Sequence, residues 1–242
     1  MTTYVMVAGA GLGGWAWHKV RRLLEAEGHS VHTPSLTGEG DRVHLLNASV
    51  DLETHVDDVT NILTYDDLKD VVLVGHSYGG VVVTGVADRV PDRVARLVYL
   101  DAPMGLSHTE MFPPAADPDQ FPRRVVDGVE LMVFPSEDLV AFYGITDPRE
   151  VTWTLARMTP HPWRASEQRL VLRDQAALEA VPRRHIVAAR TVEMGSHAGL
   201  PADERQDGRY FEINGPHALM VTHPEAVAAL LSKDPLPANN TK

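Results

Sequence analysis

The sequence predicts an α/β fold in which a mostly parallel sheet of about six strands is flanked by helices. Short apolar segments alternate with helical patterns along most of the chain, and this alternation is typical of a parallel sheet. An apolar strand, Val71–Val74, runs directly into Gly-His-Ser-Tyr-Gly-Gly and a second apolar run, which indicates a tight strand-to-helix turn at Ser77. With 242 residues, of which 44% are hydrophobic, we expect residues 1–242 to form a single domain.

The chain opens with a strand at Tyr4–Ala8, a glycine-rich loop and an amphipathic helix that ends near Glu27. The loop spells G-x-G-x-x-G, a pattern that also occurs in dinucleotide-binding folds, at Gly9, Gly11 and Gly14. A nucleotide site would need an acidic residue after the second strand, but the strand at Ser30–His32 continues into Thr-Pro-Ser. Trp15 and Trp17 would also crowd the helix start that binds a pyrophosphate. We therefore disfavour a nucleotide-binding function.

The middle of the chain continues the alternation of strands and helices. A polar, irregular segment runs from Thr33 to Ala48, and apolar residues at helical spacing predict a helix over Leu52–Leu63. After the serine turn, Val81–Val90 reads as a buried helix, and Arg96–Asp101 reads as the next strand. Open parallel sheets place their chemistry at the carboxyl ends of the strands, so Asp101 is expected at that edge.

The alternation breaks between about residues 103 and 182, where proline-rich and short helical segments predominate. An insertion of this length inside a compact domain is usually functional. We expect a small helical cap over a pocket, inserted before the penultimate strand, with the core formed by residues 1–102 and 183–233. The core would then finish with two strands, a helix and a frayed tail, at His185–Ala189, Arg209–Ile213, Pro224–Leu231 and Asp234–Lys242.

The composition excludes several classes of function. The chain has no cysteine, so disulfides, thiolate metal sites and cysteine nucleophiles are absent. Its 33 acidic residues against 22 basic residues give a net charge of −11, which disfavours nucleic acid as a partner. The start of the sequence lacks a basic leader and no apolar run is long enough to span a membrane, so we expect a cytoplasmic location without a membrane partner. We expect a small-molecule substrate and no metal or cofactor, and the chain is compatible with a homodimer.

Ser77 is the candidate nucleophile, because a serine at the apex of a strand-to-helix turn is typical of a nucleophile elbow. Such a tight turn strains the backbone of its apex residue, and Gly75 and Gly79 have no Cβ to collide across it. The turn directs the backbone N–H of Tyr78 toward the space beside the serine hydroxyl. The N–H of Ala10, in the first glycine loop, is best placed to supply the second donor of an oxyanion hole.

A serine hydroxyl needs a neighbouring base to accept its proton, and imidazole is the usual group. Among the 12 histidines, His217 is the candidate base, because Asn-Gly-Pro-His lies between the last strand and the last helix. We expect no catalytic role for the other histidines considered: His76, which reads as structural, His18 and His55, which read as exposed helical residues, and His161, His197 and His223.

These motifs resemble those of the α/β-hydrolase superfamily, in particular the branch with plant methylesterases, hydroxynitrile lyases and small bacterial esterases. The resemblance covers most of the chain, through the segments VMVAGAGLGGWAW, VVLVGHSYGG, RLVYLDAP, MTPHPW and NGPHALMVTHPEAVAALL. It implies an α/β-hydrolase fold, with Ser77 as nucleophile and His217 as base. It also implies that the backbone N–H groups of Ala10 and Tyr78 form the oxyanion hole.

The sequence departs from the pattern of this branch at three positions. Relatives commonly carry His-Gly where this chain has Ala8 followed by glycine, and the lyases place a lysine beside the base, where this chain has Ala218. Relatives also carry an aspartate just after the penultimate strand, and Thr191 lies near that position here. That aspartate orients the imidazole and stabilises its charged form, so this chain needs another acid for the task.

Two acids could replace the missing aspartate. Asp101 ends the preceding strand, a position from which haloalkane dehalogenases supply their acid, and Glu193 lies two residues beyond the expected site. Relatives often keep the aspartate equivalent to Asp101 beside the usual acid, where it must have a structural task. We favour Asp101, with Glu193 as the alternative acid and a histidine without any acid as the third hypothesis.

The predicted function is cleavage of an ester, thioester or lactone through an acyl-Ser77 intermediate. One alternative is a lyase or cyclase that uses Ser77 and His217 only to transfer protons, and another is a non-catalytic protein that binds a small molecule. The predicted cap is rich in large apolar residues, which indicates a hydrophobic pocket for a substrate larger than acetate esters. These residues are Met104, Met111, Phe112, Phe121, Met132, Phe142, Tyr143, Trp153, Met158 and Trp163.

Overall fold

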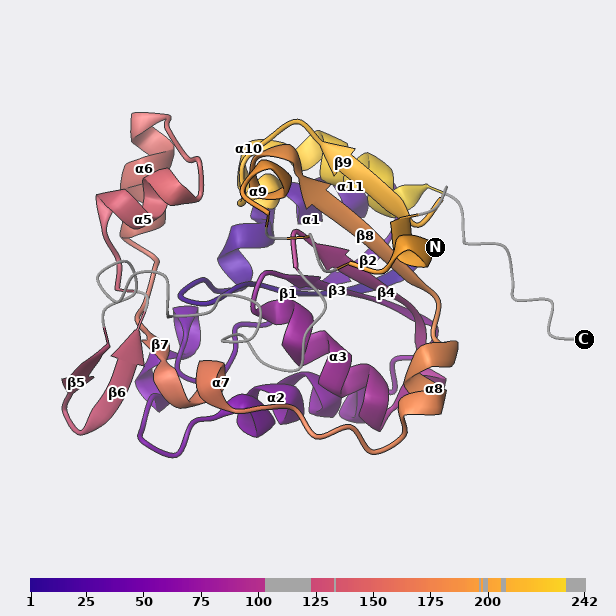
Figure 1. Cartoon of the computed structure of the whole chain (residues 1–242), viewed down its shortest axis with the longest axis horizontal. Helices are drawn as coiled ribbons and strands as arrows, with labels where there is room; N and C mark the ends of the chain where they lie inside the picture. The colour runs from indigo at the N-terminus through magenta and orange to yellow at the C-terminus, as the bar shows by residue number, and fades with distance from the viewer. Residues whose placement is uncertain (103–122, 133, 196, 198–199, 206–207, 234–242) are drawn as a thin grey trace, which may run out of the picture.

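A six-stranded parallel sheet forms the centre of the molecule (Figure 1). The computed structural model describes residues 1–102, 123–132, 134–195, 197, 200–205 and 208–233. The strands of this sheet are β1 (Thr3–Val7), β2 (Ser30–His32), β3 (Val71–His76), β4 (Val94–Leu100), β8 (Arg183–Ala188) and β9 (Tyr210–Ile213). Their order is β2-β1-β3-β4-β8-β9, and every neighbouring pair is parallel. The predicted α/β fold with a mostly parallel sheet of about six strands is therefore confirmed.

Helices cover both faces of this sheet. In Figure 1, one face carries α1 (His18–Ala26), α10 (Leu219–Thr222) and α11 (Pro224–Ser232), and the other carries α2 (Leu52–Tyr65) and α3 (Gly79–Arg89). Along β1, Tyr4 and Met6 join the core under the first set of helices. Val5 and Val7 join the core under the second set, because successive side chains point to opposite faces. This double burial explains why the strands read as continuous apolar runs.

The ends of the helices follow from local sequence. Gly28 lies just beyond the C-cap of α1 with a φ of 85°, a conformation that glycine adopts without strain. Asp51 caps α2 by accepting a hydrogen bond from the Thr54 N–H at 2.9 Å. Both helices lie close to their predicted positions. Short 3₁₀ helices connect the larger elements: η1 (Gly14–Trp17), η2 (Gly40–Leu45), η3 (Pro91–Arg93) and η4 (Ala202–Arg205).

The insertion between β4 and β8 contains strands as well as helices. The helices in its described part are α5 (Glu137–Phe142), α6 (Pro148–Leu155), α7 (Trp163–Glu167) and α8 (Gln175–Ala180). A three-stranded antiparallel sheet accompanies them, formed by β5 (Arg124–Val126), β6 (Val129–Met132) and β7 (His161–Pro162). The insertion thus contains the helices expected of a small helical cap and, in addition, a small sheet that the sequence analysis did not predict. Asp127 and Gly128 both have positive φ, as a two-residue hairpin turn requires, and this Asp-Gly signal was missed in the proline-rich pattern.

Several predictions fall outside the described residues. These are the tail at residues 234–242 and the cap residues Met104, Met111, Phe112 and Phe121. The division of the chain into a core and a cap stays a prediction. Among the residues that the structure describes, none of the helices combines the length and the apolar character needed to cross a membrane.

Candidate active site

The serine turn has the geometry that the sequence predicts. β3 is buried at all six positions, and α3 begins two residues beyond Ser77. The φ of Ser77 is 52°, in the left-handed region that residues other than glycine rarely adopt. A Cβ on Gly75 would lie 2.5 Å from the carbonyl oxygen of Gly79, and a Cβ on Gly79 would lie 2.6 Å from that of Val7. Only glycine fits at these two positions, so the packing of the turn depends on both.

The glycine loop after β1 packs directly against this turn. A Cβ on Gly9 would lie 2.8 Å from the Cβ of Ser77, so the absence of a side chain permits the close approach. Ala10 follows and is buried. Its carbonyl oxygen accepts a hydrogen bond from the Tyr143 hydroxyl at 3.0 Å. The structure thus brings the loop that contains Ala10 beside the serine turn.

Asp101 follows the carboxyl end of β4 and is the centre of a buried hydrogen-bond network. Its Oδ2 lies 2.5 Å from Nδ1 of His217. Its Oδ1 accepts hydrogen bonds from the Ala188 N–H at 2.9 Å, the Thr191 hydroxyl at 2.6 Å and Nε2 of His197 at 3.0 Å. Asp101 also has a φ of 44°, so its backbone is strained in the same sense as that of the serine. Two of its donors are imidazoles.

This network sets the charge of Asp101 and the tautomer of His217. Burial by itself would raise the pKa of Asp101, but hydrogen bonds from His197 and His217 outweigh burial and hold this pKa well below its usual range. An ionised carboxylate can only accept hydrogen bonds, so Nδ1 of His217 carries a proton and donates it to Asp101. In the neutral tautomer, this contact leaves the lone pair on Nε2.

His217 lies on the loop between β9 and α10, and three aromatic rings surround it. His76, the residue before Ser77, donates from Nε2 to the His217 carbonyl at 3.1 Å, and the two ring centroids are 4.7 Å apart. Burial lowers the pKa of His76 to about 3, which keeps it neutral and fits its expected structural role. Phe142 and Tyr143 of the insertion each place a ring centroid 5.7 Å from that of His217.

The other large apolar residues of the insertion are distributed differently. Trp153 packs against Trp15 with ring centroids 5.2 Å apart, and against His18 at 4.7 Å, on the side of α1. Met132 and Met158 are buried. Trp153 therefore packs against the side of α1, whereas Met132 and Met158 join the two hydrophobic clusters of the core.

The alternative acid, Glu193, lies in a different environment. It is the last residue of α9 (Ala189–Glu193), and its side chain is exposed, whereas Asp101 and His217 are buried. Thr191, near the position of the missing aspartate, donates its hydroxyl hydrogen bond to Asp101. The geometry therefore favours Asp101 over Glu193 as the partner of His217.

The expectation for His55 is wrong, because this histidine is fully buried. Its Nε2 lies 2.9 Å from the carbonyl oxygen of Thr37, and its Nδ1 lies 2.8 Å from the Tyr78 hydroxyl. His55 lies three residues after Leu52 and four before Val59, a spacing that places it on the buried face of α2. The burial of His55 could therefore have been predicted from the sequence. His197 was missed for a different reason: it reaches Asp101 from the irregular segment after α9, where no sequence pattern marks it.

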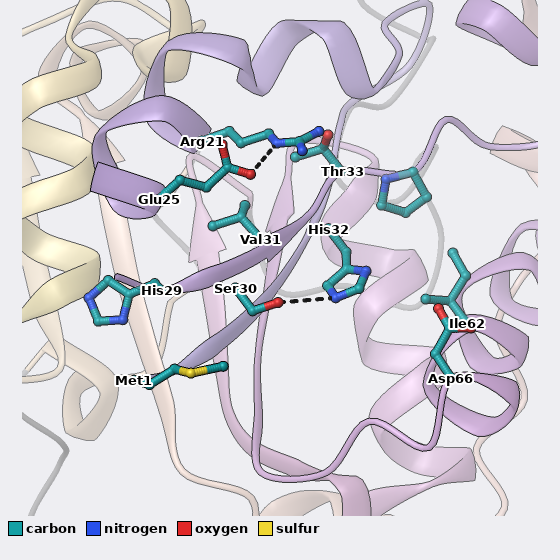
Figure 2. Close-up of a pocket in the computed structure, with 11 residues that line it drawn as sticks. Met1, Arg21, Glu25, His29, Ser30, Val31, His32, Thr33, Ile62 and Asp66 are labelled. Carbon is teal, nitrogen blue, oxygen red and sulfur yellow. Dashed lines mark hydrogen bonds and ion pairs between the residues drawn. The ribbon is translucent and has the colours of Figure 1, made fainter. Parts of the chain in front are cut away.

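A surface hollow of about 710 Å³ lies beside the edge strand β2 (Figure 2). Residues of β2, of α1 and of the end of α2 line it, and Arg21 donates to Glu25 at 2.7 Å on its rim. The strand β1 separates β2 from β3 in the sheet. This hollow contains none of the residues around Ser77, so it is not part of the candidate active site.

Comparison with characterised proteins gives relatives named for ester hydrolysis. The chain is 50% identical over 102 residues to the carbendazim hydrolyzing esterase of Nocardioides sp. (strain SG-4G), a match that covers 42% of each chain. It is 39% identical over 104 residues to the pyrethroid hydrolase of Sphingobium wenxiniae, covering 42% of this chain and 36% of the relative. It is 35% identical over 98 residues to methylesterase 8 of Arabidopsis thaliana, covering 40% and 36%. The matches thus span about two fifths of the length of these relatives.

Similarity of fold extends over nearly the whole chain. The crystal structure of a methylesterase from Arabidopsis superposes with a TM-score of 0.76 at 22% identity, covering 96% of this chain and 97% of that one. An extracellular α/β-hydrolase from a Paenibacillus species gives a TM-score of 0.75 at 23% identity, covering 96% and 98%. The sequence pattern of the alpha/beta hydrolase family matches residues 4–230. The chain therefore belongs to the α/β-hydrolase family, and its characterised relatives lie in the methylesterase and esterase branch.

Proposed function

We propose that the protein is a serine hydrolase that cleaves an ester, thioester or lactone of a small hydrophobic molecule. The observation that carries this proposal is the buried 2.5 Å contact between Asp101 and Nδ1 of His217, beside the strained turn at Ser77. A carboxylate on Nδ1 presents the opposite ring nitrogen as a base for a serine proton. The relatives named for ester hydrolysis support the same reaction class.

In the proposed reaction, the hydroxyl oxygen of Ser77 forms a bond to the carbonyl carbon of the substrate, and Nε2 of His217 takes the hydroxyl proton. Asp101 stabilises the imidazolium that results. The N–H groups of Ala10 and Tyr78 donate to the oxyanion of the tetrahedral intermediate. The carbon–oxygen or carbon–sulfur bond to the leaving group then breaks, and His217 returns the proton to it. Water, deprotonated by His217, hydrolyses the acyl-Ser77 ester in the second half of the reaction.

We further propose a substrate with a hydrophobic portion larger than an acetyl group. Phe142 and Tyr143 flank the ring of His217, and aromatic walls favour substrates that bury an apolar group. Two relatives carry names that refer to carbendazim and to pyrethroids, so both compounds belong in the substrate panel. The panel also includes p-nitrophenyl esters from acetate to octanoate and methyl esters of aromatic acids.

The test measures turnover of this panel together with labelling by a fluorophosphonate that reacts with activated serines. Wild type is expected to turn over the longer p-nitrophenyl esters faster than the acetate and to label at Ser77. Ser77→Ala should abolish labelling and lower kcat by about 10⁴-fold or more. A steady fall of kcat/KM with acyl length would contradict the proposed pocket. The absence of both labelling and turnover would contradict the proposed reaction. Labelling without turnover would favour a lyase, a cyclase or a binding protein.

A further inference from the structure

A second buried polar cluster lies beside the serine turn and takes no part in the proposed proton transfers. It consists of Glu39, which precedes η2, His161, which begins β7, His55 on α2, and Tyr78 of the turn itself. All four side chains are fully buried. Burying a carboxyl group costs free energy unless hydrogen bonds compensate. The bonds that Glu39 makes therefore indicate what the cluster does.

Glu39 connects the insertion to the glycine loop. Its Oε1 accepts one hydrogen bond from the Gly11 N–H at 2.7 Å and another from Nδ1 of His161 at 2.7 Å. Its Oε2 is buried and has no hydrogen-bond partner among the described residues. Gly11 has a φ of 73°, a conformation that glycine adopts without strain. A single side-chain oxygen thus ties this loop to β7.

The position of that hydrogen bond matters for Ala10. The Gly11 N–H belongs to the peptide unit that joins Ala10 to Gly11, and the carbonyl of the same unit accepts from the Tyr143 hydroxyl at 3.0 Å. The Gly11 carbonyl is held as well, by the Thr159 N–H at 3.1 Å. Because a peptide unit is planar, holding both of its polar ends fixes the orientation of the Ala10–Gly11 plane. The direction of the Ala10 N–H relative to that plane is then restricted.

The other proposed oxyanion donor belongs to Tyr78, whose side chain contacts the same cluster. The carbonyl of Thr37 can only accept, so Nε2 of His55 donates to it and Nδ1 of His55 accepts from the Tyr78 hydroxyl. The Tyr78 ring also lies edge-on against His161, with ring centroids 4.6 Å apart. The Glu39–His161 pair therefore contacts both the loop that contains Ala10 and the side chain of Tyr78.

The charge state of the cluster suits this location. Burial raises the pKa of Glu39 to about 7 and lowers that of His161 to about 3. Burial likewise lowers the pKa of His55 and raises the pKa values of Tyr78 and Tyr143, and the carboxylates Asp51 and Asp58 further raise the pKa of Tyr78. These shifts keep the two histidines and the two tyrosines uncharged near neutral pH. A carboxyl that is protonated below about pH 7 can hold the Gly11 N–H without placing a full negative charge beside a developing oxyanion.

We propose that Glu39, paired with His161, is a positioning residue that holds the Ala10–Gly11 peptide and so orients the Ala10 N–H within the oxyanion hole. The inference rests on the proposed function, because it assigns Glu39 a task in that reaction. Glu39 does not touch the reacting atoms in this role. Its removal should weaken stabilisation of the transition state while leaving substrate binding nearly unchanged.

The test compares Glu39→Leu, which lacks an acceptor, with Glu39→Gln, which keeps one for the Gly11 N–H. Glu39→Leu is expected to lower kcat by about 10- to 100-fold with KM changed by less than about threefold, because a misdirected oxyanion donor costs mainly kcat. Binding of a trifluoromethyl ketone, which forms an oxyanion-bearing adduct with an active serine, should weaken by a similar factor. Glu39→Gln should return kcat to within about threefold of wild type. Tyr143→Phe, which frees the other end of the same peptide, should reproduce the effect of Glu39→Leu.

Rates are expressed per active site titrated with fluorophosphonate, and the melting temperature of each variant is recorded, so a folding defect is separated from a catalytic one. Hydrogen exchange of the Gly11 amide supplies a readout that needs no turnover: exchange should be faster in Glu39→Leu and slow in Glu39→Gln. Wild-type kcat in Glu39→Leu, equal losses in the two Glu39 variants, or unchanged Gly11 exchange would each overturn the inference. If wild type has no ester turnover, the proposed function fails and the oxyanion role of Glu39 fails with it, while Gly11 exchange still decides whether Glu39 holds the loop.

Discussion

Asp101 and Glu39 are both buried carboxyl groups that contact a histidine, yet their pKa values move in opposite directions. Burial raises the pKa in each case, but Asp101 accepts four hydrogen bonds, two of them from imidazoles, and its pKa falls below its usual range. Glu39 accepts two, its second oxygen has no partner among the described residues, and its pKa rises to about 7. The number of donors around the carboxyl group, more than its depth, sets its charge.

The difference matches the two tasks proposed for these residues. Asp101 must remain negative to stabilise the imidazolium of His217 during attack. Glu39 must hold a peptide next to a site where negative charge develops, and a protonated carboxyl does so with less electrostatic opposition. The two carboxyl groups therefore differ in charge below about pH 7, where Glu39 retains its proton and Asp101 does not.

The largest expected effect comes from removing the charge of Asp101. Asp101→Asn should lower kcat by about 10⁴-fold, because the amide no longer stabilises the imidazolium and can donate to Nδ1 instead of accepting from it. Asparagine tolerates the positive φ at this position, so the backbone should be retained. Steady-state kinetics on a p-nitrophenyl ester, with circular dichroism to verify the fold, measure this prediction.

Glu193→Gln is the matched control for Asp101→Asn, since Glu193 is the other acid near the position of the missing aspartate and is exposed. It should leave kcat within about twofold of wild type, because surface substitutions away from the site rarely matter. A large loss in Glu193→Gln together with near-normal turnover in Asp101→Asn would reverse the assignment of the acid.

The second effect concerns stability, where Glu39 and Asp101 should have opposite pH dependences. Between about pH 4.5 and pH 7 the unfolded chain has released the Glu39 proton and the folded chain retains it, so the contribution of Glu39 to stability falls as the pH rises. A pKa raised from 4.5 to about 7 corresponds to a loss of roughly 3 kcal/mol by pH 8. Glu39→Gln has no carboxyl group to ionise and so lacks this loss. The stability of Glu39→Gln relative to wild type should therefore be higher at pH 8 than at pH 5.

The contribution of Asp101 to stability depends on pH in the opposite direction. Its lowered pKa contributes stability that is present above its unfolded pKa and is lost as the pH falls through the folded pKa. Asp101→Asn should therefore be less stable than wild type at both pH 5 and pH 8. Urea unfolding of the three proteins at the two pH values measures both predictions. A difference between Glu39→Gln and wild type that stays constant from pH 5 to pH 8 would show that Glu39 is ionised throughout.

A smaller loss of turnover than that of Asp101→Asn is expected at His197, one of the four donors to Asp101. His197→Phe keeps a ring of similar shape but removes the hydrogen bond, and should lower kcat by about tenfold or less, since Asp101 retains three donors. The pKa of Asp101 should move up toward its ordinary value. A loss as large as that of Asp101→Asn would mean that His197 participates in proton transfer, and that result would place it among the catalytic residues.

The fold was predictable from the sequence because its signals are local. The strand at Val71–His76 and the helix at Gly79–Arg89 are apolar runs that meet at a glycine-flanked serine, and steric limits on that turn leave little choice of structure. The Asp-Gly hairpin at residues 127–128 was also a local signal, but the surrounding prolines obscured it. Its detection would have added the β5–β6 hairpin to the expected helical cap.

The buried hydrogen bonds that surround the candidate site could not be predicted, because they join distant parts of the chain. Glu39 and His161 are 122 residues apart, and Asp101 and His197 are 96 residues apart. Neither pair lies at a spacing that a periodicity reveals. The pairing of His217 with Asp101 could be predicted from the sequence, because each residue follows a strand of the parallel sheet. The carboxyl ends of those strands meet at one edge. Residues on irregular segments, such as Glu39 and His197, carry no comparable positional signal.

The contrast between the two carboxyl groups is measured most directly by their own titrations. Carbon-13 NMR of protein labelled at aspartate and glutamate carboxyls, with assignments from Asp101→Asn and Glu39→Gln, would follow both groups between pH 4 and pH 9. Asp101 should show no titration in this range, and Glu39 should titrate near pH 7. A Glu39 that is already ionised at pH 5, or an Asp101 that gains a proton above pH 4, would contradict the division of tasks between the two pairs.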